Sequence, residues 1–241
     1  MPWLSRLRLG RLPSVVLSIV GLLLFIGLAA VILTVISGLT ALPSTVLTSP
    51  ACPAPCWYDI RPGQTKVGTV LGILDAQPFV RGSSVRVWPA SGDINQIAWF
   101  FQRPAPDTAG YAYFDSEQCT ALSITTQGTL NIGQALSKFG QPERIFTQTG
   151  QEGLRAWVEV DLVYPAAGYV VEADLDAPAK SDPPQVTIRQ QTSVMRVTYF
   201  DPQRFQALLA NSTIIHGPAN LSQSALQPWP GLDKAISYTR P

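Results

Sequence analysis

The sequence predicts an α+β protein with one N-terminal transmembrane helix, followed by an extracytoplasmic region of two tandem helix-plus-antiparallel-sheet repeats. A long uncharged apolar stretch near the N-terminus predicts the membrane helix. A short helical pattern that occurs twice, each time followed by strand-like runs, predicts the repeats. The expected regions are a basic cytoplasmic end at 1–13, the transmembrane helix at 14–42, a Pro-rich stalk at 43–56, repeat 1 at 57–127, repeat 2 with a closing helix at 128–211, and an irregular tail at 212–241.

The apolar stretch runs from Val15 to Leu42 and holds no charged residue in its 28 positions. As a helix it would be about 42 Å long, which exceeds the hydrocarbon core of about 30 Å. Arg6, Arg8 and Arg11 precede it, and positive charge beside a first span stays in the cytoplasm. We therefore expect a single-pass protein of the plasma (inner) membrane, with the lipid bilayer as a partner through 14–42 and the C-terminal domain extracytoplasmic.

Two alternatives for the N-terminus stay open. A cleaved signal peptide has an apolar core of about 7–15 residues, which is shorter than this stretch. A lipoprotein would be anchored at Cys52, but Ser49 holds the position where a lipobox has leucine. Both comparisons favour an uncleaved anchor.

Charge is divided unevenly along the chain. Three of the 17 basic residues precede the apolar stretch, and the other 14 are matched by 16 acidic residues after it. A near-neutral outer region has no electrostatic footprint for nucleic acid and no polybasic patch for anionic lipid. We therefore expect no nucleic-acid partner.

Cys52, Cys56 and Cys119 lie in the region expected outside the cytoplasm, where thiols tend to form disulfides. Pro-Ala-Pro separates Cys52 from Cys56 and favours extended backbone, which would hold their Cα atoms beyond the roughly 7 Å that a disulfide permits. Because Trp57 marks the expected start of the packed domain, we expect a Cys56–Cys119 disulfide, with Cys52 left free or available to a second chain. A zinc site usually needs four ligands and His216 is the only histidine, so neither a metal nor a cofactor is expected.

Two segments carry apolar residues at i, i+3, i+4 and i+7, the spacing of one face of a short helix. The two sets are Val67, Val70, Leu71 and Leu74, then Ile132, Ala135, Leu136 and Phe139. Thr65 is the expected N-cap of the first helix, and Thr129 or Asn131 that of the second.

A helix-entry motif, Ile60-x-Pro62-Gly63-x-Thr65, precedes the first helix. Proline fixes φ before a turn, glycine can adopt positive φ, and threonine can accept a backbone N–H of the new helix. We therefore interpret the motif as a structural turn and not as a catalytic one.

Strand-like runs separated by turn residues follow each helix. After the first helix they are Val85–Trp88, Ile94–Gln102, Tyr111–Asp115 and Cys119–Thr126. After the second helix they are Arg144–Gln148, Leu154–Tyr164, Tyr169–Asp174, Val186–Gln190 and Val194–Phe200. We expect each repeat to form its own antiparallel sheet with one helix against it.

A last helix is expected after the second set of strands. Asp201-Pro202 would cap it, and it would extend to Asn211. Its inner face would carry Phe205, Leu208 and Leu209.

The Cys-Trp-x-x-Ile-x-Pro-Gly-x-Thr opening from Cys56 to Thr65 is similar to that of uncharacterised bacterial membrane-anchored proteins. The same helix entry, together with Gly140-x-Pro142 after the second helix, resembles the small lipoprotein subunit of the outer-membrane β-barrel assembly machine. That resemblance implies a helix pair packed on a three-stranded antiparallel sheet. A membrane helix is expected here in place of that family's lipid anchor.

Aromatic residues are concentrated between residues 88 and 114, and an exposed aromatic surface would indicate a binding site. Trp88, Trp99 and Tyr111 are the candidate binding residues. The primary expectation is a non-enzymatic interaction or scaffold module of the cell envelope. It would bind an envelope protein or polymer, or serve as the ectodomain of a larger membrane complex.

The alternative is a carboxylate-dependent envelope hydrolase. Alternation over residues 154–162 predicts a half-buried strand with Glu159 and Asp161 on its solvated face. The acidic stretch from Glu172 to Asp182 lacks the ordered spacing of a calcium loop and is interpreted as a solvated edge. No residue is assigned a catalytic role.

Overall fold

The computed structural model describes residues 19–20, 22–29, 52–89, 94–102, 108–152, 155–177, 184–210 and 226–238. Residues 1–41 and 42–241 form two units, each described by itself. In the first unit, residues 19–20 and 22–29 are helical, and their large apolar side chains are 49–71% exposed. Within the described residues, no helix is both long enough and apolar enough to cross a membrane. The rest of the predicted span 14–42, the basic end 1–13 and the stalk as far as residue 51 lie outside the described residues.

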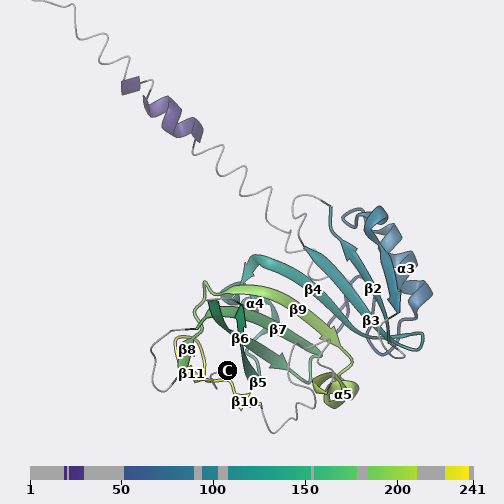
Figure 1. Ribbon diagram of the computed structural model, residues 1–241. Coiled ribbons are helices and arrows are strands. Elements are labelled where there is room, and N and C mark those ends of the chain that lie inside the picture. Colours follow the sequence, from purple (N-terminus) through teal and green to yellow (C-terminus); the bar gives the residue numbers. More distant parts are fainter. Residues whose placement is uncertain are drawn as a thin grey trace, which may run out of the picture. The chain divides into compact units, whose positions relative to one another are not determined.

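In the second unit, nine of the described strands form one antiparallel sheet in the order β1-β2-β3-β4-β9-β7-β6-β5-β10 (Figure 1). Their bounds are β1 Arg86–Pro89, β2 Ile94–Phe100, β3 Ala109–Asp115, β4 Gln118–Asn131, β5 Arg144–Glu152, β6 Arg155–Tyr164, β7 Tyr169–Asp176, β9 Ser193–Phe200 and β10 Gln227–Pro228. A separate two-stranded sheet pairs β8, Gln185–Thr187, with β11, Ala235–Ser237. Every run predicted as a strand overlaps one of these strands, although the bounds differ by several residues at β4 and β5.

The large sheet consists of two halves with the same order of elements. The helix α3, Val67–Ala76, precedes β1 to β4, and the helix α4, Ile132–Phe139, precedes β5, β6, β7 and β9. The α+β class and the antiparallel pairing are confirmed. The expectation of a separate sheet in each repeat is wrong, because β4 pairs with β9 and joins the halves into one sheet.

Helices pack on both faces of the sheet. On one side, called the helix face, α3 contributes Val70 and α4 contributes Ile132 to the main core. The opposite side, called the outer face, includes Val163 and Val170 and is partly covered by the helix α5, Phe205–Leu209. A 3₁₀ turn, η1 at Gly82–Ser84, connects α3 to β1.

The closing helix follows the prediction closely. Asp201 accepts a hydrogen bond from the Gln203 N–H at 3.0 Å at the start of the 3₁₀ turn η2, Pro202–Arg204, which leads into α5. Phe205, Leu208 and Leu209 are all buried, so the inner face is confirmed, although the helix ends at Leu209.

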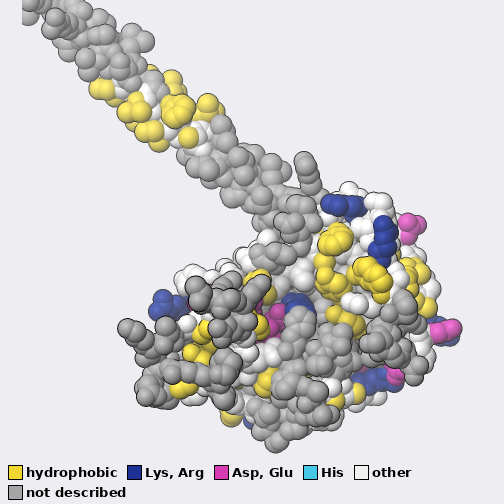
Figure 2. Space-filling model, in the orientation of Figure 1, with side chains coloured by type: hydrophobic (Ala, Val, Ile, Leu, Met, Phe, Trp, Pro, Cys, Tyr) yellow, Lys and Arg dark blue, Asp and Glu magenta, His cyan; other side chains and the backbone are white. Residues whose placement is uncertain are grey.

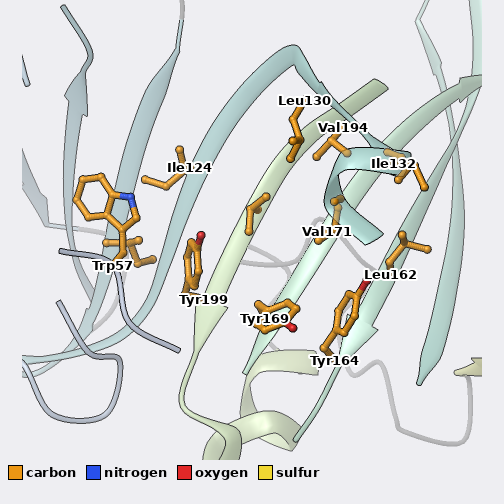
Figure 3. Close-up of a cluster of buried hydrophobic side chains, with 14 of the residues drawn as sticks. Trp57, Ile124, Leu130, Ile132, Leu162, Tyr164, Tyr169, Val171, Val194 and Tyr199 are labelled. Carbon is orange, nitrogen blue, oxygen red and sulfur yellow. The ribbon is translucent and has the colours of Figure 1, made fainter. Parts of the chain in front are cut away.

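The core on the helix face changes character along the sheet. Under the first half it is aromatic: the ring centroid of Trp57 lies 5.6 Å from that of Trp99 and 6.4 Å from that of Phe101. Figure 3 shows Trp57 at one end of this cluster and Leu162 and Tyr164 at the other. Burial of each such large apolar side chain contributes about 1.5–3 kcal/mol.

The helix-entry motif forms the predicted turn but with a different role for its threonine. Ile60 and Pro62 are buried, and Gly63 has φ +82°, a conformation that favours glycine. The Arg61 N–H donates to Thr65 Oγ1 at 2.8 Å, so Thr65 closes the loop before the helix. The N-cap of α3 is Lys66, which makes no side-chain capping bond. The prediction that Thr65 caps α3 is therefore wrong.

The cysteine pairing also differs from the prediction. Cys52 is joined to Cys56, with 5.4 Å between their Cα atoms, and Cys119 is a buried free thiol in β4. The backbone bends at Cys52, Ala54 and Pro55, so the assumption of extended backbone fails. The predicted Cys56–Cys119 disulfide is therefore wrong.

Candidate functional site

The strand β6 places its charged residues on a face that is buried. Val158, Val160 and Leu162 point into the main core, as the alternation predicts. Glu159 and Asp161 point to the outer face, yet they are only 3% and 1% exposed. The prediction of a solvated face is wrong, because the alternation does not reveal that a second layer, which includes α5, packs on that side of the sheet.

The antiparallel register brings more carboxylates to the same place. Asp161 pairs across the sheet with Glu172 of β7, and Glu159 pairs with Asp174. One carboxylate oxygen from each of Glu159, Asp161 and Glu172 lies within 4.8 Å of the other two. We call these three residues the carboxylate cluster. Glu172 is 7% exposed, so all three members are buried.

Two neighbouring strands supply donors to the cluster. Arg196 of β9 lies opposite Glu172, and its Nη2 is 3.0 Å from Glu172 Oε1. Gln148 of β5 lies opposite Glu159, and its Nε2 donates to Glu159 Oε1. Neither carboxylate oxygen of Asp161 has a hydrogen-bond partner. Figure 2 shows acidic and basic side chains together in a recess of this view, in the region where Figure 1 places β7 and β9.

Burial and mutual repulsion raise the pKa values of all three acids. Burial, assisted by the Glu172 charge, raises the pKa of Glu159 to about 8. Burial and then the Glu159 charge raise the pKa of Asp161 well above its usual range. Burial also raises the pKa of Glu172, while the Arg196 guanidinium opposes that rise. The cluster therefore holds protons at a pH where exposed carboxyl groups have lost them.

A hollow lined by described residues lies elsewhere on the domain, and the cluster does not line it. That hollow is lined by Lys66, Asp115, Ser116, Glu117, Gln118 and Arg204. Groups that are 1–7% exposed leave no room for a substrate to reach both carboxyls. The arrangement is suited to holding protons or an ion.

The three aromatic binding candidates do not form one site. Trp99 is fully buried against Trp57, so the prediction that it contacts a ligand is wrong. Tyr111 is half-buried and packs against the smaller core on the outer face. Trp88 of the edge strand β1 is 48% exposed and remains a candidate.

Sequence reasoning missed two groups of candidate functional residues. Val87 of β1 and Phe100 of β2 are 52% and 45% exposed, and a spacing pattern alone does not separate exposed apolar residues from buried ones. The cluster partners Glu172 and Arg196 come from β7 and β9, and only the strand order brings them together.

No protein-family model matches the chain, and comparisons with curated proteins and with solved structures gave no match.

Proposed function

We propose that this chain is anchored in the plasma membrane by the 14–42 segment and binds an extended segment of an envelope protein along the strand β1. The observation that carries the binding role is the position of the exposed apolar side chains. In the described part of the second unit, the large hydrophobic side chains that are exposed are Val87, Trp88 and Phe100, on two adjacent strands at one edge of the sheet. Val87 and Trp88 are consecutive in β1 and therefore point to opposite faces of the sheet. Exposed apolar side chains at the edge of a sheet are typical of an interaction site.

The two edges of the sheet support this location. β10 covers the edge at β5, whereas β1 pairs only with β2 among the described strands. An open edge strand offers its free backbone groups to an added strand, and neighbouring side chains then supply specificity. The pairing of Trp88 with Gln96 leaves the indole beside the open edge.

Two observations support an extracytoplasmic membrane protein. The helical residues between Ile19 and Leu28 expose large apolar side chains in every described turn, which a lipid environment would bury. The Cys52–Cys56 disulfide is typical of an oxidising compartment. The basic residues Arg6, Arg8 and Arg11 would keep the N-terminus cytoplasmic.

We further propose that the two halves of the sheet are tandem repeats. Each half has one helix followed by four antiparallel strands, and the sheet order places β1 to β4 as the mirror sequence of β5, β6, β7 and β9. The helix pair on a three-stranded sheet that the resemblance to the barrel-assembly lipoprotein implies differs from the one helix and four strands described in each half.

The alternative, a carboxylate-dependent hydrolase, has weaker support. Retaining glycosidases hold two carboxyl groups about 5–5.5 Å apart beside a cleft that admits substrate. Here the oxygens of Glu159, Asp161 and Glu172 approach that spacing, but the groups are buried away from the described hollow. The open β1 edge therefore supports the binding function better.

Site-specific photocrosslinking in native membranes tests the proposal. A photoreactive residue at position 88 should give a discrete adduct, and one at the exposed Gln203 should not. The Val87→Asp change should reduce the adduct from position 88, because it places a charge on the docking strand. Equal adducts at both positions, or none at position 88 in membranes where the protein is abundant, would contradict the β1 site.

A further inference from the structure

Three carboxylates converge where the sheet offers them few donors. Glu159 and Asp161 project from β6 and Glu172 from β7, with their nearest oxygens within 4.8 Å of one another. Arg196 is the basic residue paired with this group across the strands, and Asp174 adds a fourth carboxylate opposite Glu159. Four carboxyl groups therefore lie on these paired strands, and Arg196 is the one basic residue described in register with them.

Asp161 is the member that identifies a missing ligand. It is 1% exposed, its oxygens lie among those of the other two acids, and neither oxygen has a hydrogen-bond partner. A buried carboxylate without donors is costly unless it is protonated or bound to a cation. The other two acids differ from Asp161 in this respect. Gln148 donates to one oxygen of Glu159, and Arg196 donates to one oxygen of Glu172.

We propose that Glu159, Asp161 and Glu172 bind one calcium ion. Calcium takes oxygen ligands at about 2.3–2.6 Å, so two ligands on opposite sides of the ion lie up to about 5 Å apart, which matches the observed spacing. Three carboxylates that bind through one or both oxygens supply most of the six to eight ligand oxygens that calcium takes.

The donor set favours calcium over other divalent ions. All three ligands are carboxylates, whereas zinc prefers sites with imidazole or thiolate ligands. Magnesium demands near-ideal octahedral geometry and keeps several waters, which a site only 1–7% exposed does not easily provide. Gln148 and Arg196 would orient the two glutamates, as second-layer partners do in metal sites. This site would replace the expectation of no metal that came from the sequence.

Titration of the chelator-treated full chain in detergent micelles with CaCl₂ tests the site. We expect saturable binding in calorimetry with a Kd of about 1 mM or tighter, the range of extracellular calcium modules. The midpoint of thermal unfolding should rise with calcium concentration, because the ion binds the folded chain. MgCl₂ at equal concentration should shift the midpoint less.

Matched variants assign the ligands. Asp161→Asn keeps the shape of the side chain and should weaken calcium binding by about tenfold or more, since even second-layer changes cost 10–100-fold. Asp115→Asn changes an exposed carboxylate in the first half and should leave binding unchanged. If Asp161→Asn does not fold, Glu172→Gln provides the same comparison.

Three results would overturn the inference. The first is no heat of binding and no shift of the unfolding midpoint at about 10 mM CaCl₂, a concentration about tenfold above the weakest Kd of such modules. The second is an affinity for magnesium equal to that for calcium. The third is an unchanged calcium affinity in the folded variants. Because the variants do not touch β1, failure of this site leaves the crosslinking test of β1 unaffected.

Discussion

The first half of the sheet, β1 to β4 with α3, and the second half, β5 to β9 with α4, share one order of elements but differ in side-chain chemistry. The first half has a core of aromatic rings that meet Trp57 in tilted or edge-on contacts, and its edge strand β1, which exposes Trp88, pairs only with β2 among the described strands. The second half has an aliphatic core on β6, a covered edge at β5 and the carboxylate cluster.

The difference is greatest on the outer face. On equivalent central strands, β3 presents Tyr111 and Tyr113 to this face, whereas β7 presents Glu172 and Asp174. On the helix face both halves must fill the space under a helix with apolar side chains, so variation there is limited to size and shape. The outer face is therefore where two halves of similar architecture can acquire separate functions.

The largest expected effect comes from truncation of either core. Trp57→Ala should lower the free energy of unfolding by about 3–5 kcal/mol, and Leu162→Ala in the second half by about 2–5 kcal/mol, because both side chains are fully buried. Since β4 pairs with β9, both variants should unfold in one transition at a lower urea concentration. Circular dichroism and tryptophan fluorescence of the full chain in detergent would measure this. Two separate transitions in either variant would show that the halves fold independently.

The second expected effect is a dependence of stability on pH that arises in the second half alone. Because the pKa of Glu159 is raised from 4.5 to about 8, the folded chain holds its proton more tightly than the unfolded chain does. In calcium-free buffer the free energy of unfolding should therefore fall as the pH rises from about 5 to 8. The slope is up to about 1.4 kcal/mol per pH unit for each carboxyl that releases its proton in this window.

Variants locate the source of that slope. Glu159→Gln should reduce the slope, because it removes one of the three buried carboxyl groups, whereas Asp115→Asn in the first half should not, because Asp115 is exposed and its ion pair with Arg204 is 3.4 Å long. Urea unfolding at a series of pH values would measure both. Stability that rises from pH 5 to 8 in calcium-free buffer would contradict the buried, proton-holding cluster.

Local sequence patterns predicted most of the fold. All nine expected strand runs, both main helices and the closing helix are present, because period-2 and period-3.6 patterns record which side chains face a core. The patterns did not predict that β4 and β9 join the two halves, since strand order depends on contacts between distant residues. They also did not predict the Cys52–Cys56 disulfide, which depends on how the backbone bends across Pro-Ala-Pro.

The candidate site was predicted only in part. Alternation placed Glu159 and Asp161 on one face of a strand, and the structure agrees. It assigned that face to solvent, because a single strand carries no information on what packs against it. The convergence with Glu172 and the ion pair to Arg196 required the pairing of β6, β7 and β9. Trp99 shows the opposite error, because it was predicted to be exposed and is buried. An aromatic side chain suits a binding surface or a core equally well, and the sequence does not show which face of the sheet it lies on.

The smallest expected effect compares the starts of the two helices. The Asn131 side chain accepts a hydrogen bond from the Gln134 N–H at 2.9 Å, and the Gln134 side chain accepts one from the Asn131 N–H at 3.0 Å, which together form a capping box at α4. Lys66 at the start of α3 makes no side-chain capping bond. Asn131→Ala should therefore lower the free energy of unfolding by about 1 kcal/mol, whereas Lys66→Ala should change it by less than about 0.5 kcal/mol.

Asn131→Asp is the matched control for this comparison, because aspartate also accepts the N–H bond and should retain most of the stability. Urea unfolding of the four proteins at one pH and one calcium concentration separates the cap from the carboxylate cluster. If Lys66→Ala lowered the free energy of unfolding as much as Asn131→Ala does, α3 would depend on its N-cap side chain as α4 does. The expected difference would instead show that α3 does not depend on a side-chain cap; the N–H of its first residue, Val67, donates to the Glu117 carbonyl at 2.8 Å.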